Sequence, residues 1–275
     1  MNKVWLITGA NSGFGRAFTE AAVAVGDIVV ATARRPEALA DLVAAHPDRV
    51  EALRLDVTDQ AAGQAVIDDV IARHGRLDVL VNNAGRTHVG AVEETADDEL
   101  RDLFDLHFFG PAALIRAALP HMRARRSGAI VQLSSMGGQL SFAGFGAYSA
   151  TKFALEGLSE ALADELRPLG IKVLIVEPGA FRTGLFGNAS TSGQIDDYDS
   201  TSGETRRMVA TGDGTQPGDP AKAAEAVIAA LEAEHTPLRL PLGDDSVDAL
   251  LAHLESVRTE IATWEKTARA TAFDS

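Results

Sequence analysis

The chain contains 275 residues, and its 25 basic and 39 acidic side chains give a formal net charge of −14 at pH 7. This acidic balance argues against a nucleic-acid partner, because phosphate binding requires clustered Lys and Arg. Cysteine is absent, which excludes disulfides, thiolate catalysis and cysteine metal sites and fits a reducing cytoplasm, the location that we expect.

Length and hydropathy predict one folded unit. With 46% hydrophobic residues, the chain can bury a single large core, so we expect one domain spanning residues 1–275. The apolar run near the N-terminus is too short for a signal peptide or a membrane span, and we expect neither. The seven histidines lack the spacing of metal ligands, so no metal is expected.

The first predicted strand, residues 4–8, leads into a glycine-rich turn. Thr-Gly-Ala-Asn-Ser-Gly-Phe-Gly occupies residues 8–15 and opens a helical pattern. Glycines let the backbone approach a pyrophosphate, and the free N–H groups at a helix start favour an anion. We therefore predict a dinucleotide site, with an ordinary glycine-rich connection as the alternative. The residues concerned are Gly9, Asn11, Ser12, Gly13, Phe14 and Gly15.

The second predicted strand, residues 27–33, bears on the type of dinucleotide. Folds that prefer NAD usually place Asp or Glu near the end of this strand, where it accepts hydrogen bonds from the ribose 2′-OH. Ala33 occupies that place here, and Arg34 and Arg35 follow it. Two guanidinium groups can bind a 2′-phosphate, so we expect NADP. The alternative is a pair of solvated arginines ahead of the helix predicted at 36–46.

The chain then alternates between strand and helix. Strands are predicted at residues 49–55, 77–81, 128–133 and 171–176, and helices at 59–74, 97–119 and 147–169, with a kink at Pro111. This alternation predicts a Rossmann-like α/β fold, a doubly wound parallel sheet of about seven strands with helices on both faces. Ligands of such sheets bind at the carboxyl ends of the strands, which is where Gly9, Asp56, Asn82 and Ser135 fall.

Tyr148 and Lys152 form a candidate acid/base pair. At positions i and i+4 of a helix they share one face, so the ammonium would favour the phenolate of Tyr148. Ser135 follows the apolar run at 129–133 and could supply a third polar group at the same place. For Tyr148 and Lys152 taken alone, a solvated surface pair is the alternative.

Taken in order, these motifs resemble the short-chain dehydrogenase/reductase family. They are Thr-Gly-x-x-x-Gly-x-Gly at 8–15, Asn-Asn-Ala-Gly at 82–85, Ser135, Tyr-x-x-x-Lys at 148–152 and Pro-Gly at 178–179, and they cover residues 3–185. The resemblance implies that Tyr148 is the general acid or base. It also implies that Lys152 lowers the pKa of that phenol and holds the nicotinamide ribose, and that Ser135 binds the substrate oxygen. Further cofactor contacts are implied for Asp56, Val57, Asn83, Ala84, Gly85, Pro178, Gly179, Phe181 and Thr183.

One position departs from the family pattern. Family members usually carry an Asn that holds a proton-relay water near the lysine, and this chain has His107 there. An imidazole can also bind water, and it titrates near neutrality. Three interpretations stay open: His107 works in the relay, it is structural and leaves activity reduced, or the protein is no longer an enzyme. On the first, His107→Asn retains or raises activity and shifts its pH profile.

The remaining chain divides into a variable segment, residues 186–219, and a C-terminal part, residues 220–275. The stretch 187–219 is rich in Gly, Ser, Thr and Asp, a composition that predicts a mobile surface loop. The family resemblance implies that this region covers the substrate, so ordering on binding is the alternative. A helix at 219–234, an edge strand at 238–242 and a helical stripe at 247–264 follow. We expect this stripe to pack on the body of the fold, with a subunit contact as the alternative.

We expect an NADP(H)-dependent reductase acting on a carbonyl or alcohol. The alternatives are a dinucleotide-binding sensor that has lost turnover and an NAD-linked alcohol or steroid dehydrogenase. A homo-oligomer is compatible with the sequence. If the apolar side chains near the predicted site line a pocket, a hydrophobic substrate suits it better than a phosphorylated sugar; for each of these side chains a place in the core is the alternative. The candidates for the apolar pocket are Phe142, Phe145, Phe181, Phe186, Ile195, Tyr198 and Met208.

Overall fold

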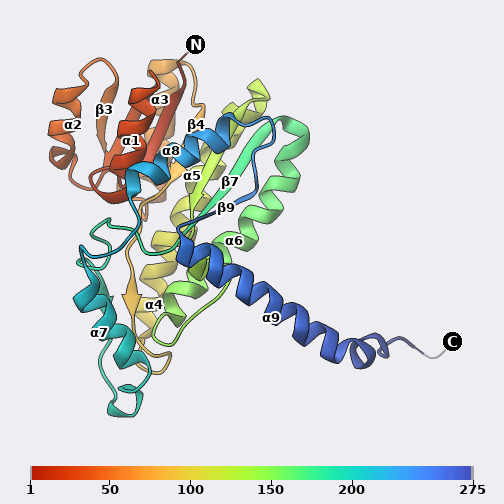
Figure 1. Ribbon diagram of the computed structural model, residues 1–275. Coiled ribbons are helices and arrows are strands. Elements are labelled where there is room, and N and C mark those ends of the chain that lie inside the picture. The colour runs from red at the N-terminus through yellow and green to blue at the C-terminus, as the bar shows by residue number, and fades with distance from the viewer. Residues whose placement is uncertain (1, 274–275) are drawn as a thin grey trace.

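Seven parallel strands form the centre of the molecule. The computed structural model describes residues 2–273, and its main sheet has the strand order β3-β2-β1-β4-β6-β7-β9 (Figure 1). Every neighbouring pair in this sheet is parallel, which confirms the predicted fold class. The strands are β1 (Val4–Thr8), β2 (Ile28–Ala33), β3 (Val50–Arg54), β4 (Val79–Asn82), β6 (Gly128–Leu133), β7 (Ile171–Pro178) and β9 (Arg239–Leu242).

Helices cover both faces of this sheet, because successive side chains of a strand point to opposite faces. Trp5 and Ile7 of β1 belong to the core that α1 (Gly13–Ala24), α2 (Ala40–Ala45) and α8 (Pro220–Glu232) complete. Val4 and Leu6 belong to the opposite core, completed by α3 (Gln60–His74), α5 (Gly110–Arg125) and α6 (Gly146–Leu166). The chain therefore forms the three layers that the alternating pattern predicts.

The long helix predicted at 97–119 is divided into two. A π-helical turn, Asp105–Phe109, separates α4 (Asp97–Phe104) from α5. The interruption lies directly before Pro111, the residue at which the kink is predicted, and it takes the form of this π-helical turn, with Pro111 in the first turn of α5. The π-helical turn contains His107 and places this residue in the interior, where it is 1% exposed.

The segment predicted as a mobile loop is folded. It contains β8 (Ser190–Thr191), which pairs with β5 (His88–Val89), and the helix α7 (Ser202–Gly212). The composition of this segment could not predict these elements. The contacts that hold the segment come from residues about 100 positions earlier in the chain.

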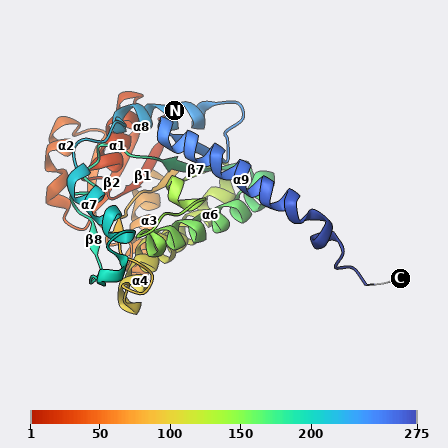
Figure 2. The ribbon, with the colours of Figure 1, turned by 60° about the horizontal axis from the view of Figure 1, so that its bottom comes forward.

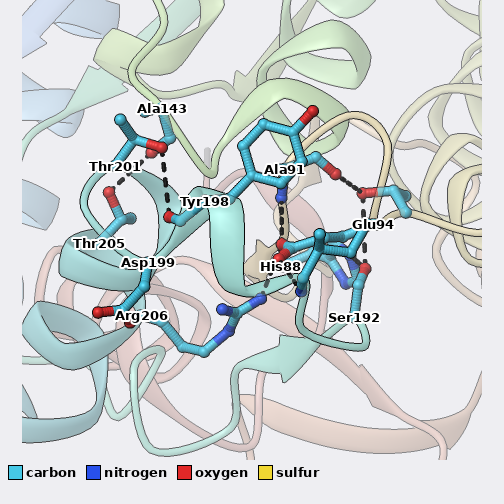
Figure 3. Close-up of polar contacts among 12 residues, drawn as sticks. His88, Ala91, Glu94, Ala143, Ser192, Tyr198, Asp199, Thr201, Thr205 and Arg206 are labelled. Atoms are coloured by element: carbon cyan, nitrogen blue, oxygen red, sulfur yellow. Dashed lines mark hydrogen bonds and ion pairs between the residues drawn. The ribbon is translucent and has the colours of Figure 1, made fainter.

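A buried carboxylate anchors this folded segment (Figure 3). Glu94 accepts hydrogen bonds from the backbone N–H groups of Ala91 at 2.7 Å and Ile195 at 2.9 Å, and it pairs with Arg206 of α7 at 2.9 Å. Burial raises the pKa of the Glu94 carboxyl, but the hydrogen bonds and the Arg206 charge outweigh it and lower that pKa. The ionised form of Glu94 thus holds α7 over the carboxyl ends of the sheet.

The predicted edge strand is confirmed as β9. It pairs in parallel with β7 and places Arg239 beside Ile175 and Pro241 beside Glu177. Proline is tolerated here because an edge strand has one side without strand partners. β7 itself extends two residues beyond the predicted end, through Glu177 and Pro178, so a buried glutamate lies within the strand.

The last helix, α9 (Asp244–Arg269), extends away from the body of the molecule (Figures 1 and 2). The expectation that its apolar stripe packs on the fold is wrong beyond the first turns. Leu250 is buried, but Leu251, Ile261 and Trp264 are 62%, 64% and 65% exposed. Helical periodicity shows which side of a helix is apolar, but it gives no information on what covers that side. Within residues 2–273, no helix is both long enough and apolar enough to cross a membrane.

Because residues 254–269 are exposed along their whole length, ending the chain after His253 should leave the folded body intact. We expect the melting temperature to change by no more than about 2 °C. The matched control is Leu250→Ala, which removes a side chain that is 3% exposed and should cost about 2–5 kcal/mol. Thermal unfolding followed by circular dichroism tests both, and a large loss of stability on truncation would show that α9 is held by contacts beyond those described.

Candidate active site

One large cavity opens at the carboxyl ends of the strands. Its volume is about 1280 Å³, and every predicted catalytic and cofactor residue except Gly15 lines it. These residues come from eight separate stretches of sequence, so the fold brings together what the motifs leave far apart. Among residues 2–273, no group of three or more His, Cys, Asp or Glu side chains is placed to hold a metal ion.

The floor of the cavity is the junction between β1 and β4. The Thr8 hydroxyl accepts hydrogen bonds from the backbone N–H groups of Asn83 at 2.9 Å and Ala84 at 3.0 Å. The Asn83 amide in turn donates to the carbonyl oxygens of Thr8 at 2.8 Å and Gly9 at 3.1 Å. Asn83, predicted as a cofactor contact, therefore also fixes the glycine-rich turn in place.

Gly15 lies beneath this junction and does not line the cavity. A Cβ atom at Gly15 would lie 2.3 Å from the Gly9 carbonyl oxygen and 2.5 Å from the Asn83 amide nitrogen. Both distances are far inside van der Waals contact, so only glycine lets α1 approach β1 this closely. The Ser12 side chain makes no capping hydrogen bond at the start of α1, so this side chain leaves the first N–H groups open to an anion.

Arg34, Arg35 and Asp56 lie on the part of the cavity wall formed by the ends of β2 and β3. Both arginines are exposed and can reach a ligand. Asp56 accepts hydrogen bonds from the Thr58 hydroxyl at 2.8 Å and the Thr58 backbone N–H at 3.1 Å. Burial raises the pKa of Asp56, but these hydrogen bonds and the charges of Arg34 and Arg54 outweigh it and lower the pKa. The Asp56 carboxyl is thus ionised, and the guanidinium groups whose charges act on it are those of Arg34 and Arg54.

Ser135, Tyr148 and Lys152 meet at another part of the wall. Ser135 follows β6, and its hydroxyl accepts a hydrogen bond from the Gly137 N–H at 3.0 Å. Burial raises the pKa of the Tyr148 phenol to about 12, and a hydrogen bond with Ser135 opposes that rise. The phenol is therefore protonated at neutral pH and can act as an acid.

The Lys152 ammonium lies 5.7 Å from the centroid of the Tyr148 ring. It donates a hydrogen bond to the Leu133 carbonyl oxygen at 2.7 Å. Burial lowers the pKa of Lys152 to about 8, and the charge of Glu156 opposes this. The net shift of the pKa of the phenol is upward, opposite to the expected direction, because burial of the phenol is its largest cause.

His107 is held by hydrogen bonds on both ring nitrogens. Its Nε2 accepts from the backbone N–H of Arg86 at 3.2 Å, and its Nδ1 lies 2.9 Å from the Thr151 hydroxyl, which itself donates to the Tyr148 carbonyl oxygen at 2.7 Å. The ring meets that of Tyr148 edge-on, with centroids 5.7 Å apart. Burial, followed by the charges of Lys152 and Arg86, holds the pKa of His107 well below its usual value.

The imidazole is therefore neutral, with the proton on Nδ1. The expectation that His107 titrates near neutrality is wrong, because a buried cation beside Lys152 is unfavourable. With both nitrogens engaged, the ring links Thr151, in the second turn of α6, to the chain after β4.

Part of the predicted apolar pocket is present. The side chains of Phe142, Phe145, Phe181, Phe186 and Met208 line the cavity. Ile195 and Tyr198 do not belong to its lining: the Tyr198 hydroxyl donates to Glu93 at 2.6 Å, on the segment that carries Glu94.

The sequence did not indicate Gln216, which also lines the cavity. It is 4% exposed, and neither atom of its side-chain amide has a hydrogen-bond partner among the described residues. Gln216 lies in the connection between α7 and α8, where no motif or periodicity marks it.

The close approach of the Gly9 carbonyl oxygen to Gly15 allows a direct test of the glycine-rich turn. Gly15→Ala should abolish binding of a nicotinamide dinucleotide, measured with NADPH and with NADH, because the new Cβ would displace the Gly9 backbone. Gly157→Ala is the matched control: Gly157 lies in the exposed face of α6 with nothing within 4 Å of its added Cβ. This control should stabilise the protein by about 0.5–1 kcal/mol and keep its NADPH affinity. Fluorescence titration and thermal unfolding measure both effects, and a Gly15→Ala variant with normal affinity would contradict the steric argument.

The neutral, locked state of His107 predicts how its variant behaves. His107→Asn should change the height of the pH–rate profile without moving its midpoints between pH 6 and 8, because no proton is gained or lost there. Thr151→Val is the control for the hydrogen bond to Nδ1. Steady-state rates across this pH range give the answer. A shifted acid-side midpoint in His107→Asn would show that the imidazole titrates during turnover.

Known proteins are similar in sequence to this chain over most of its length. A family model described as short chain dehydrogenase matches residues 3–193. The relative named Oxidoreductase BOA17, from Botryotinia fuckeliana, is 35% identical over 274 residues, which are 99% of this chain and 100% of that protein. The 3-ketodihydrosphingosine reductase of Bacteroides thetaiotaomicron is 40% identical over 199 residues, 71% of each protein.

Solved structures agree with this likeness. A short-chain dehydrogenase from Streptomyces avermitilis has a TM-score of 0.95 and 64% identity, covering 99% of this chain and 100% of that one. A short chain dehydrogenase/reductase from Burkholderia phymatum in complex with NAD has a TM-score of 0.81 and 26% identity, covering 96% of this chain and 95% of that one. A metagenomic short-chain oxidoreductase in complex with NADP has a TM-score of 0.68 and 29% identity, covering 87% and 96%.

The order of the motifs, their meeting in one cavity at the strand ends, and a family match over residues 3–193 agree. The chain belongs to the short-chain dehydrogenase/reductase family.

Proposed function

We propose that the protein is an NADP(H)-dependent oxidoreductase that transfers a hydride between the nicotinamide and a carbonyl or secondary alcohol substrate. The observation that carries this proposal is the shared cavity. Ser135, Tyr148 and Lys152 lie in the same 1280 Å³ space as the glycine-rich turn and Arg34. An acid/base group and a dinucleotide site in one cavity are what such a reaction requires.

The residues present fit a dinucleotide. Gly15 leaves room for the turn that a pyrophosphate needs, and the Ser12 side chain leaves the N-terminus of α1 open. Asp56 and Val57 would flank the adenine, and Asn83 to Gly85 the ribose. Lys152 would hold the nicotinamide ribose hydroxyls, and the segment from Pro178 to Thr183 would contact the carboxamide. When bound, the nicotinamide supplies or accepts the hydride.

The protein's own groups move and hold the proton. In reduction, the protonated Oη of Tyr148 donates its proton to the substrate oxygen while the Ser135 hydroxyl binds the same oxygen. The phenolate that forms is stabilised by the Lys152 ammonium, 5.7 Å from the ring centroid. The high pKa of Tyr148, about 12, means that the resting site carries the proton that reduction consumes.

Arg34 and Arg35 support NADP over NAD. Ala33 leaves no carboxylate at the end of β2 to bind a ribose 2′-OH, whereas two exposed guanidinium groups can bind a 2′-phosphate. Related structures hold NADP in one case and NAD in another, which supports a nicotinamide dinucleotide in general.

The substrate is best matched by a hydrophobic ketone. Five apolar side chains line the cavity, from Phe142, Phe145, Phe181, Phe186 and Met208. A relative with 40% identity is named as a reductase of 3-ketodihydrosphingosine, a name that supports a ketone with a long apolar part.

The proposal predicts a cofactor preference and a loss of turnover. Wild-type protein should bind NADPH more tightly than NADH, and Arg34→Ala should weaken NADPH binding about tenfold or more. Arg123→Ala, an exposed arginine at the end of α5, is the matched control. On a panel of apolar ketones, Tyr148→Phe should lower kcat by about 10²–10⁴. Tight NADPH binding with no turnover on any ketone would favour the sensor, and a preference for NADH would overturn the role given to Arg34.

A further inference from the structure

A cluster of buried charged side chains lies behind the candidate acid/base pair. Glu156 is one helical turn after Lys152 on α6, and it is 4% exposed. Glu177 of β7 is fully buried. Arg239 of β9 joins the two: its Nε lies 3.0 Å from Glu156 Oε2 and 3.4 Å from Glu177 Oε1.

The two carboxyl groups share the Arg239 guanidinium, and their proximity affects the protonation of Glu177. Burial and then the charge of Glu156 raise the pKa of Glu177 to about 7. The Gln139 amide donates to Glu177 Oε1, whereas Glu156 Oε1 and Glu177 Oε2 have no hydrogen-bond partner among residues 2–273. A proton on Glu177 relieves the repulsion between two buried carboxylates.

Glu156 shares the buried side of α6 with Lys152, because residues at i and i+4 are neighbours on a helix. Lys152 is 6% exposed, and its ammonium donates to the Leu133 carbonyl oxygen. The Ser134 Oγ and the Glu156 Oε1 lie 2.5 Å and 2.9 Å from the point where a Cβ of Gly138 would be, so the Glu156 carboxyl faces the chain that follows β6. The two ionisable groups therefore lie on the same side of α6, away from water.

We propose that Glu156 is a positioning residue that keeps the Lys152 ammonium charged inside the protein, and that Glu177 and Arg239 hold the Glu156 carboxylate for this purpose. A buried lysine loses its proton readily unless an opposite charge is near. Burial is the largest cause that lowers the pKa of Lys152, and Glu156 is the charge that opposes it.

The other charged groups around the cluster do not replace Glu156. The Glu160 side chain is 56% exposed and pairs with Arg239 at 2.8 Å. Asp245 accepts a hydrogen bond from the Ala180 backbone N–H at 2.7 Å, on the segment after β7. His107 is neutral, and its protonation would oppose the charge on Lys152.

The titration of Lys152 can be measured directly. The chain contains only five lysines: Lys3, Lys152, Lys172, Lys222 and Lys266. In protein labelled with ¹³C-lysine, the Cε signals can be followed by NMR from pH 6 to 11, and Lys152→Arg identifies the signal of Lys152. We expect a wild-type midpoint near 8. In Glu156→Gln this midpoint should fall by about one pH unit or more.

Glu160→Gln is the matched control, because it removes a carboxylate from the same arginine one turn further from Lys152. Its Lys152 midpoint should equal that of the wild type. Equal midpoints in wild type and a folded Glu156→Gln would overturn the proposal, as would an equal shift in Glu160→Gln. If Glu156→Gln does not fold, the double variant Glu156→Gln/Glu177→Gln replaces the carboxyl pair by two amides. The Lys152 midpoint of this double variant should lie about one pH unit or more below the midpoint of Glu177→Gln alone. Equal midpoints in these two variants would overturn the proposal.

This inference rests on the proposed function, in that Lys152 is taken to act on Tyr148. Where a ketone is turned over, the alkaline limb of the pH–rate profile should move to lower pH in Glu156→Gln and stay in place in Glu160→Gln. A wild-type protein that reduces no ketone would refute the proposed function, whereas the lysine titration would still decide the role of Glu156.

Discussion

The hydrogen bonds that join the ends of β1 and β4 are the constraint on which the rest of the site depends. Thr8 and Asn83 tie the two strands together at the point where the sheet order reverses. This junction fixes the position of the glycine-rich turn relative to the end of β1, and the turn fixes where α1 begins. Because every strand of the main sheet is parallel, the same edge also receives Ser135 from β6 and the segment that follows β7.

Burial is the largest cause of the pKa shifts of the groups around this edge. It favours the neutral form of each one: the pKa of Tyr148 rises to about 12, that of Lys152 falls to about 8, and that of His107 falls well below its usual value. Burial therefore raises the pKa of an acid such as Tyr148 and lowers the pKa of bases such as Lys152 and His107. At Lys152 the charge of Glu156 opposes this effect.

The sequence was most informative where structure is local. β1, β4 and β6 are buried on both faces, so their apolar runs stand out, and Asp59 marks the start of α3 by accepting a hydrogen bond from the Ala62 N–H. The predicted end of β7 was two residues short because Glu177 is polar. Its burial depends on Arg239 and Gln139, which are far away in the chain. The predicted loop before α8 and the predicted packing of α9 failed for the same reason, since composition and period describe a segment without its neighbours.

The position of Arg239 in the chain has a consequence for how the protein is made. During synthesis the N-terminal part folds first, at about 5–20 residues per second. Gln139, Glu156 and Glu177 leave the ribosome before Arg239, so the carboxyl pair is assembled without its cation for part of that time. Until the last strand docks beside β7, those carboxyls lack the guanidinium that pairs with both of them, and β7 has no strand partner on that side. The final strand of the nascent chain thus pairs with β7 and brings the cation to two buried carboxyls in a single step.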